Sequence, residues 1–183
     1  MQFVFDTGFE PSTKVNIKGG QDYFITLSDK ITLGEWIDIE NVLQSDSDTK
    51  ISEILAIVCR PAGESYNVET TKERKELFRS LSCDMALPLL AFFFTQKERV
   101  RSDFEPLFTG GGSGKPLSRG YQNFCNKWGG WYKTIADLAE DKIYLFDQIT
   151  GKTVVEVFGF LLYRIDKARA EEEQYKFEKQ VKR

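Results

Sequence analysis

Side chains able to carry out chemistry are few in this chain, because the sequence contains no histidine. That absence excludes nucleophiles activated by an imidazole base, and it excludes histidine-containing zinc sites. Carboxylates remain, and four of them could converge in a folded chain: Asp38, Glu40, Glu53 and Asp84. Their expected places on helix surfaces and at helix ends favour structural roles. We therefore expect no catalytic residue, no metal-binding residue and no cofactor.

The glycine-rich stretch GGGSGKP, residues 110–116, invites comparison with the phosphate-binding motif G-x-x-x-x-G-K-[ST]. Thr109 stands where that motif requires its first glycine, and Pro116 replaces the hydroxyl that would bind magnesium. The sequence before it is charged and contains Pro106, whereas the motif follows a buried strand. We expect a flexible linker over residues 102–120, in which the loop 109–116 either only connects or binds a partner.

Two further groups of residues lack the spacing of a metal site: the acidic pair Asp46 and Asp48, and the three cysteines. Asp46 and Asp48 lack the central glycine and the closing glutamate of a calcium loop, so we expect a solvated loop. Cys59, Cys83 and Cys125 are odd in number, widely spaced and set in apolar or aromatic contexts. Buried free thiols in a reducing compartment are the plain interpretation.

Composition indicates a protein of ordinary globular type. The chain has 183 residues, 41% apolar and 29% charged, with a net charge of -3 and interspersed signs. No basic stripe is present, so nucleic acid is not expected as a primary ligand.

The start of the sequence lacks the features of a signal peptide, and the apolar run at residues 81–94 is too short to span a bilayer. The abundant aromatic residues suggest a dense core or contact surfaces.

The elements that must position these residues are mainly helical. We expect a mainly α fold (α+β) with a small N-terminal β-hairpin or three-stranded sheet, a helical bundle and a long C-terminal helix. Residues 1–30 should form strands that pack on the helical body, and residues 31–101 should form the helical core. The linker 102–120 should lead to C-terminal helices over 121–183, within the same domain.

Local signals place several of these elements. Strands are expected over residues 2–6, 13–17 and 22–27, with Gly19-Gly20 as a hairpin turn and Phe24 on the apolar face. Capping boxes at Thr32–Glu35 and Thr153–Glu156 predict two helix starts. A helix is expected over residues 51–60. The run LSCDMALPLLAFFF, residues 81–94, is expected to be the central buried helix.

Aromatic residues recur at three- and four-residue steps between Tyr121 and Asp141. A helix broken or bent at Gly129-Gly130 would place them on one face, where packing is the usual role. Farther on, the charged end of the last helix keeps a thin apolar trace. The residues that we expect to bind a partner are Trp128, Trp131, Tyr132, Tyr175 and Phe177.

Four blocks in this order resemble small helical proteins of tailed bacteriophages, of the tail-assembly-chaperone type, or a small virion protein of phages that infect Bacteroidota. The blocks are ITLGEWIDIENVL, ILAIVCRP, LFRSLSCDMALPLLAFFF and WGGWYKTIADLAEDKIYLFDQITGKTVVEVFGFLLYRIDKA. The likeness covers residues 31–168. Its motifs are packing motifs rather than chemical ones, and the strand-forming first 27 residues lie outside it.

The resemblance implies a non-enzymatic protein that binds other phage proteins during particle or tail assembly, in the host cytoplasm or in the virion. Homo-oligomers are compatible with this expectation. Three alternatives stay open at the level of sequence: a structural component of the virion, an inhibitor of host defence that acts by binding, and a small carboxylate- or metal-dependent enzyme.

Overall fold

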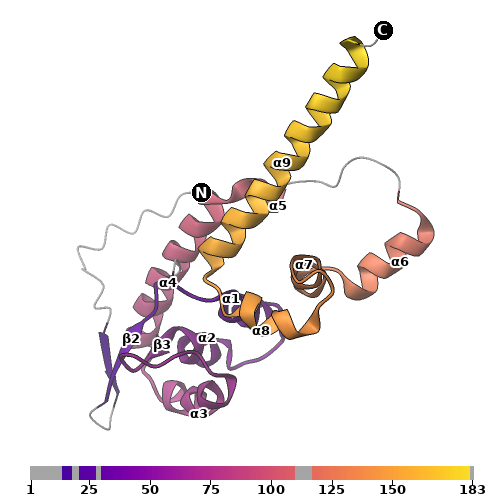
Figure 1. The fold of residues 1–183 in the computed structure, drawn as a ribbon. Coiled ribbons are helices and arrows are strands. Elements are labelled where there is room, and N and C mark those ends of the chain that lie inside the picture. Colours follow the sequence, from indigo (N-terminus) through magenta and orange to yellow (C-terminus); the bar gives the residue numbers. More distant parts are fainter. Residues whose placement is uncertain (1–13, 18–20, 28–29, 110–116, 182–183) are drawn as a thin grey trace. The chain divides into compact units, whose positions relative to one another are not determined.

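The computed structural model describes residues 14–17, 21–27, 30–109 and 117–181. Helices dominate these ranges, accompanied by a small antiparallel sheet and a long C-terminal helix (Figure 1), so the predicted mainly α fold is confirmed. The chain divides into two compact units. Unit 1 holds the described residues up to Leu27 and then Asp38–Gln96; unit 2 holds Lys30–Ile37 and the described residues from Lys97 onward.

Unit 1 contains the sheet and the helices around it. Its elements are β1 (Lys14–Ile17), β2 (Gln21–Ile25), α2 (Lys50–Val58), β3 (Cys59–Arg60), α3 (Val68–Arg79) and parts of α1 (Leu33–Gln44) and α4 (Cys83–Asp103). Unit 2 contains the remaining parts of α1 and α4. Its other elements are α5 (Glu105–Thr109), α6 (Arg119–Trp128), α7 (Trp131–Leu138), a 3-10 turn (Ile143–Leu145), α8 (Phe146–Thr150) and α9 (Val154–Val181).

The sheet has the order β1-β2-β3 with both pairings antiparallel. Its third strand, Cys59–Arg60, directly follows α2, where the sequence pattern predicts the last turn of a helix over 51–60. The expected strand at residues 2–6 and the turn at Gly19-Gly20 lie outside the described residues. Two residues suffice for β3 because the Thr26 backbone N–H also donates to the Val58 carbonyl, at 2.7 Å.

The buried face of β2 differs from the one predicted. Tyr23 and Ile25 are buried, whereas Phe24 between them is 38% exposed. Side chains alternate across a strand, so burying Tyr23 forces Phe24 to the opposite side. The Tyr23 ring meets Phe78 of α3 edge to face, with centroids 5.6 Å apart. The sheet is thereby anchored to the helical part of unit 1.

Helix α2 is largely buried in unit 1, since every side chain from Ile54 to Val58 is buried. Its C-terminal carbonyls are reached by Arg74 of α3, whose buried guanidinium donates to the Ala56 carbonyl at 3.0 Å and pairs with Glu64. The Ala56 carbonyl and the Glu64 carboxylate compensate the free-energy cost of burying the Arg74 charge. Arg74 therefore fastens α3 to the end of α2.

Acid is expected to weaken the contact between α2 and α3. The Glu53 carboxylate accepts from Lys75 Nζ at 2.8 Å and from the Thr49 and Ser47 hydroxyls, and the Lys75 bond is the largest cause that lowers the Glu53 pKa from 4.5 to about 2. A lowered pKa in the folded state stabilises the fold above pH 4.5, and this contribution disappears as the pH falls to about 2.

Glu53→Gln should therefore reduce stability near neutral pH and remove about 2 kcal/mol of acid sensitivity between these pH values. Urea denaturation at a series of pH values measures this difference. The exposed Glu76→Gln on α3 is the matched control, and it should keep the wild-type acid response. Parallel pH profiles for wild type and Glu53→Gln would contradict the prediction.

Helix α4 is not the fully buried central helix that the run at residues 81–94 suggested. Its buried side chains form one stripe: Ala86, Leu89, Leu90, Phe93, Lys97 and Val100. Leu87 and Pro88 are exposed, and the helix continues through Pro88. Phe92 and Phe94 are half-buried on either side of buried Phe93. The apolar residues of this run are dense enough to allow burial on all sides, but the surrounding elements cover only one face.

The two predicted capping boxes are present in unit 2. Thr32 Oγ1 accepts from the Glu35 backbone N–H at 3.2 Å, while the Glu35 carboxylate accepts from the Thr32 N–H at 2.8 Å. Thr153 and Glu156 make the same pair of bonds at 3.3 and 2.9 Å. The hydrogen bonds satisfy backbone donors at the starts of α1 and α9.

These two helix starts are also joined to each other. Thr32 and Thr153 form an isolated antiparallel bridge. On either side, the Leu33 N–H donates to the Lys152 carbonyl at 2.8 Å and the Val154 N–H donates to the Ile31 carbonyl at 2.9 Å. The start of α9 is thus held beside the start of α1, and it brings the first turns of α9 against Trp36.

The segment predicted as a linker, residues 102–120, is helical at both of its described ends. Helix α4 runs to Asp103, α5 covers Glu105–Thr109, and α6 begins at Arg119. Proline at position 106 signalled a loop, yet Pro106 occupies the first turn of α5, where its missing N–H costs nothing. Residues 110–116 lie outside the described residues. Among the described helices, none is both long and apolar enough to cross a membrane.

Candidate partner-binding site

Phe158 of α9 is the centre of the aromatic core of unit 2. Its ring is 1% exposed and meets four other rings with centroids 5.4 to 5.9 Å apart. The rings of Trp36, Phe104 and Phe108 lie edge to face with Phe158, and the Trp131 ring is stacked on it. Aromatic pairs in these geometries stabilise by about 0.5–1.5 kcal/mol beyond area burial. The cluster fixes α1, α5, α7 and α9 around one side chain.

The glycine pair between α6 and α7 sets the position of Trp131. A Cβ on Gly129 would lie 2.2 Å from the Cys125 carbonyl oxygen, and Gly130 has φ +71°. Both positions therefore require glycine. The predicted break at Gly129-Gly130 is confirmed, because α6 ends at Trp128 and α7 begins at Trp131. The turn directs the Trp131 indole onto the Phe158 ring, to which it lies almost parallel at 8°.

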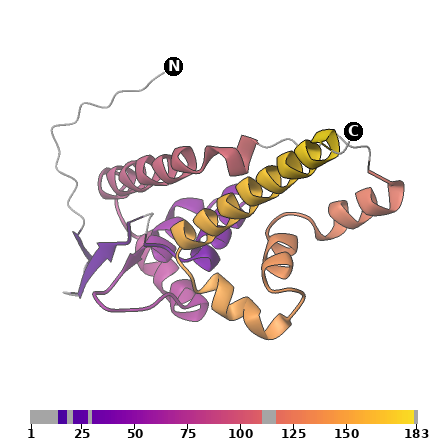
Figure 2. The ribbon, with the colours of Figure 1, turned by 45° about the horizontal axis from the view of Figure 1, so that its top comes forward.

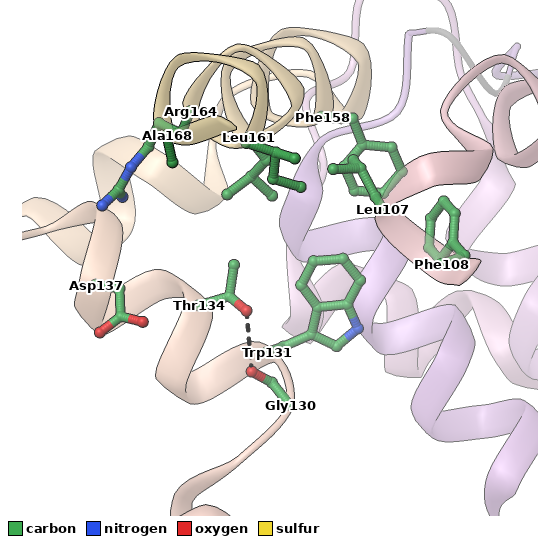
Figure 3. Close-up of a pocket in the computed structure, with 11 residues that line it drawn as sticks. Leu107, Phe108, Gly130, Trp131, Thr134, Asp137, Phe158, Leu161, Arg164 and Ala168 are labelled. Atoms are coloured by element: carbon green, nitrogen blue, oxygen red, sulfur yellow. Dashed lines mark hydrogen bonds between the residues drawn. The ribbon is translucent and has the colours of Figure 1, made fainter. Parts of the chain in front are cut away.

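Beside this cluster lies a groove of about 550 Å³ within unit 2 (Figure 3). Helix α5 contributes Leu107 and Phe108, and α7 and α9 form the rest of the lining. Gly130 lies just before α7, the residues from α7 are Trp131, Thr134 and Asp137, and those from α9 are Phe158, Leu161, Arg164, Ile165 and Ala168. Most of this lining is apolar, with the charged groups Asp137 and Arg164 drawn at one end (Figure 3).

Two polar side chains of the groove lining, Thr134 and Asp137, have hydrogen-bond partners within unit 2. The Thr134 hydroxyl donates to the Gly130 carbonyl at 3.1 Å. Asp137 accepts from Lys133 at 2.6 Å, and this bond raises the pKa of the lysine. The Arg101 guanidinium lies 5.5 Å from the centre of the Phe108 ring. The arrangement suits apolar side chains of a ligand, with charge available at one end for a polar contact.

The three aromatic residues predicted near the glycine pair do not act alike. Trp131 faces the core and lines the groove. Trp128 and Tyr132 are exposed, with ring centroids 5.4 Å apart, and the Tyr132 ring also meets Phe146 of α8 at 5.8 Å. The structure therefore places Trp128 and Tyr132 together on the surface of unit 2, outside the groove. Whether any of the three binds a partner stays a prediction.

Tyr175 and Phe177 lie near the end of α9, the long yellow helix in Figures 1 and 2. Every side chain from Arg169 to Val181 is exposed. The two aromatic residues are two positions apart, so they point to different sides of the helix, about 200° from each other. The Lys179 ammonium lies 4.4 Å from the centre of the Tyr175 ring. These two predicted residues share an element without sharing a face.

Two of the four carboxylates considered for catalysis, Asp38 and Glu53, have hydrogen-bond or ion-pair partners of their own. Asp38 accepts from the Tyr66 hydroxyl, Glu53 pairs with Lys75, and Asp84 is exposed in the first turn of α4. Asp46 and Asp48 are exposed between α1 and α2. Within the described ranges, no three acidic, cysteine or histidine side chains gather closely enough to hold a metal ion.

Only one of the three cysteines fits the predicted burial. Cys59 is buried in β3, and that burial raises the pKa of its thiol to about 12. Cys83 is exposed and Cys125 is half-buried, which corrects the expectation for both. Cys83 opens α4, where the following residues turn inward only from Ala86. An apolar neighbourhood in sequence did not show which side of the helix would be covered.

Sequence reasoning missed the groove residues of α5 and the central role of Phe158. Leu107 and Phe108 were hidden within a predicted linker. The available signal was the spacing of Phe104, Leu107 and Phe108, which is three and four residues and therefore helical. Phe158 stood in an apolar helix start where several residues were equally good candidates for the core.

Comparison of the chain with protein-family models, with curated proteins and with solved structures finds no match. The function proposed below is therefore argued from the residues of the chain and from the resemblance of its helical blocks.

Proposed function

We propose that this chain is a non-enzymatic protein of a tailed bacteriophage that binds other phage proteins during tail or particle assembly. The observation that carries the proposal is the exposed end of α9, in which every side chain from Arg169 to Val181 is exposed. Phe177 and Val181 lie one turn apart in this stretch, with 61 and 69% of their surface open to solvent. Large apolar side chains that remain uncovered on one element favour a protein partner.

The physical reason concerns the stability of an unsupported helix. A helical segment of about 13 residues is marginal in water when nothing packs against it. Ion pairs along α9, such as Lys176 with Glu172 at 2.9 Å, are exposed and contribute little. A partner that covers the face with Phe177 and Val181 would bury these two side chains and stabilise the helix. The groove of unit 2 offers a second, mostly apolar surface for a partner.

Deletion of the gene in the phage that encodes it tests this function. We expect particle yield to fall and full-length protein supplied in trans to restore it. A chain that ends at Ala168 should fail to restore it, because the exposed end of α9 is missing. Far-UV circular dichroism of the shortened chain is the folding control, and it should show that the other helices remain.

The composition of purified particles separates the two forms of the proposal. Absence of the protein from finished particles supports a chaperone, and stoichiometric presence supports a virion component. Normal particle yield and normal particle morphology after deletion would contradict an assembly function in either form.

A further inference from the structure

Helix α9 carries a second face, separate from the one facing the groove, with large apolar side chains toward both of its ends. The residues of this face, here called the α9 seam, follow each other at alternating steps of three and four: Phe160, Tyr163, Lys167, Ala170, Gln174, Phe177 and Val181. All seven side chains are exposed. The groove face contains Phe158, Leu161, Ile165 and Ala168 instead. Figures 1 and 2 show α9 as one uninterrupted helix through both stretches.

Steps of three and four residues are the spacing of a coiled-coil seam. In heptad notation Phe160, Lys167, Gln174 and Val181 take the a positions, while Tyr163, Ala170 and Phe177 take the d positions. The seam runs for about 32 Å along the helix. Polar residues at internal a positions, such as Lys167 and Gln174, lower the affinity between two paired helices. They also determine the register of the pair and the choice of partner helix. The seam thus has the pattern of a selective helix-binding surface.

Acidic residues flank most of the seam. The e positions are Arg164, Glu171 and Glu178, and the g positions are Asp166, Glu173 and Gln180. Four of these six side chains are acidic and one is basic. Glu171 lies 3.8 Å from Lys167 and Asp166 lies 3.7 Å from Arg169, but these pairs are exposed and weak. A partner helix with lysine or arginine beside its own apolar stripe would complement this pattern.

A second copy of the chain fits the seam less well. Parallel pairing would bring Asp166 against Glu171 and Glu173 against Glu178 of the other copy, and it would place the two Lys167 side chains in one layer. Antiparallel pairing with Phe160 against Phe177 would bring Arg164 near Glu171 but Asp166 near Glu173, so attraction and repulsion cancel. The charges therefore favour a different chain.

The structure leaves room for such a partner beside the first half of the seam. Phe160, Tyr163 and Lys167 border a shallow hollow of about 430 Å³ between α9 and the end of α7. Phe160 and Tyr163 are 52 and 58% exposed there, with their rings 6.3 Å apart. Large side chains of a docked helix would enter this hollow while the second half of the seam contacts the next turns of the partner.

From spacing, exposure and charge together, we infer that the α9 seam binds an amphipathic helix of another protein that carries basic residues beside its apolar stripe. This inference rests on the proposed function, because it names the chemistry of the partner that an assembly protein would hold. It also distinguishes Phe177, which lies in the seam, from Tyr175, which points to the other side of α9.

Synthetic helices test the inference with the full-length chain. The probe is a fluorescent three-heptad peptide with leucine at a and d and lysine at e and g. The first control has glutamate at e and g, and the second is a scrambled basic peptide without heptad spacing. Fluorescence anisotropy should show about tenfold tighter binding of the basic heptad peptide than of either control.

Two matched variants locate the binding surface. Phe177→Ser should weaken binding of the basic peptide about tenfold, and Tyr175→Ser should leave it unchanged. Both replace an exposed aromatic side chain two positions apart on the same helix, so their effects on folding should be alike, as circular dichroism would verify. Glu173→Lys combined with Glu178→Lys should shift the preference toward the acidic peptide.

Equal binding of the basic and acidic peptides would overturn the inference, as would equal losses from Phe177→Ser and Tyr175→Ser. Sedimentation analysis adds a third decisive outcome: a dimer of the wild-type chain that Phe177→Ser dissociates would make a second copy the occupant. These measurements use purified components and no phage. A failure here, alongside an assembly defect on gene deletion, would leave the proposed function standing with a different partner.

Discussion

Replacing Phe158 with alanine should lower the free energy of unfolding of unit 2 by about 3–5 kcal/mol. The Phe158 ring is almost fully buried and contacts four other aromatic rings from separate elements. Its removal loses the transfer free energy of the ring and leaves a cavity beside the groove. Backbone hydrogen bonds on either side of the Thr32–Thr153 bridge hold the start of α9, so collapse of that cavity is limited.

Tryptophan fluorescence during urea denaturation measures the lowered free energy of unfolding of unit 2. The three tryptophans, Trp36, Trp128 and Trp131, all belong to unit 2, and two of them touch Phe158. The control is Phe160→Ala, two residues along α9, where the side chain is 52% exposed. It should change stability by less than about 0.5 kcal/mol. Similar effects of the two substitutions would contradict a core centred on Phe158.

The parts of the fold that sequence predicted well are those with local causes. Each capping box needs only a threonine and a glutamate three residues apart, and both boxes form the expected hydrogen bonds. The break at Gly129-Gly130 also has a local cause, since one glycine avoids a backbone clash and the other has positive φ. Such features follow from residues that are neighbours in the chain.

The parts that sequence reasoning missed depend on distant residues. Cys59–Arg60 forms a strand because β2 lies alongside and Thr26 accepts from the Arg60 guanidinium at 2.9 Å. No pattern within residues 51–60 indicates that neighbour. Pro106 similarly suggested a loop, although a proline in the first turn of a helix is equally acceptable. Helix α5 becomes recognisable once Phe108 is seen against Phe158.

In the candidate site, sequence reasoning likewise could not decide which single side chains would be buried. Periodicity placed Trp128, Trp131 and Tyr132 in one aromatic group, but it could not say which ring would be covered. The turn at Gly130 decides this, because it sends Trp131 to the core and leaves Trp128 and Tyr132 exposed. On α9 the aromatic content was evident, whereas the distinction between Tyr175 and Phe177 required the course of an unbroken helix.

The second large effect is expected at Phe93 of α4, where aspartate should unfold unit 1. Phe93 is 1% exposed and belongs to the single buried stripe of that helix. A carboxylate there loses its hydration without gaining a partner, and the phenyl ring is lost as well, so the cost should exceed about 4 kcal/mol. Leu90→Asp, one turn earlier in the stripe, should have a comparable effect.

Hydrogen exchange read by mass spectrometry tests this within unit 1. In Phe93→Asp, peptides that cover α2, Lys50–Val58, should lose their protection. Leu87→Asp is the matched control, since Leu87 lies on the same helix and is 54% exposed. It should keep α2 protected. Lower pH should partly restore the protection of α2 in Phe93→Asp, because a neutral carboxyl group costs less to bury than a charged one. Protection of α2 that is equal in the two variants would show that the buried stripe of α4 does not hold unit 1 together.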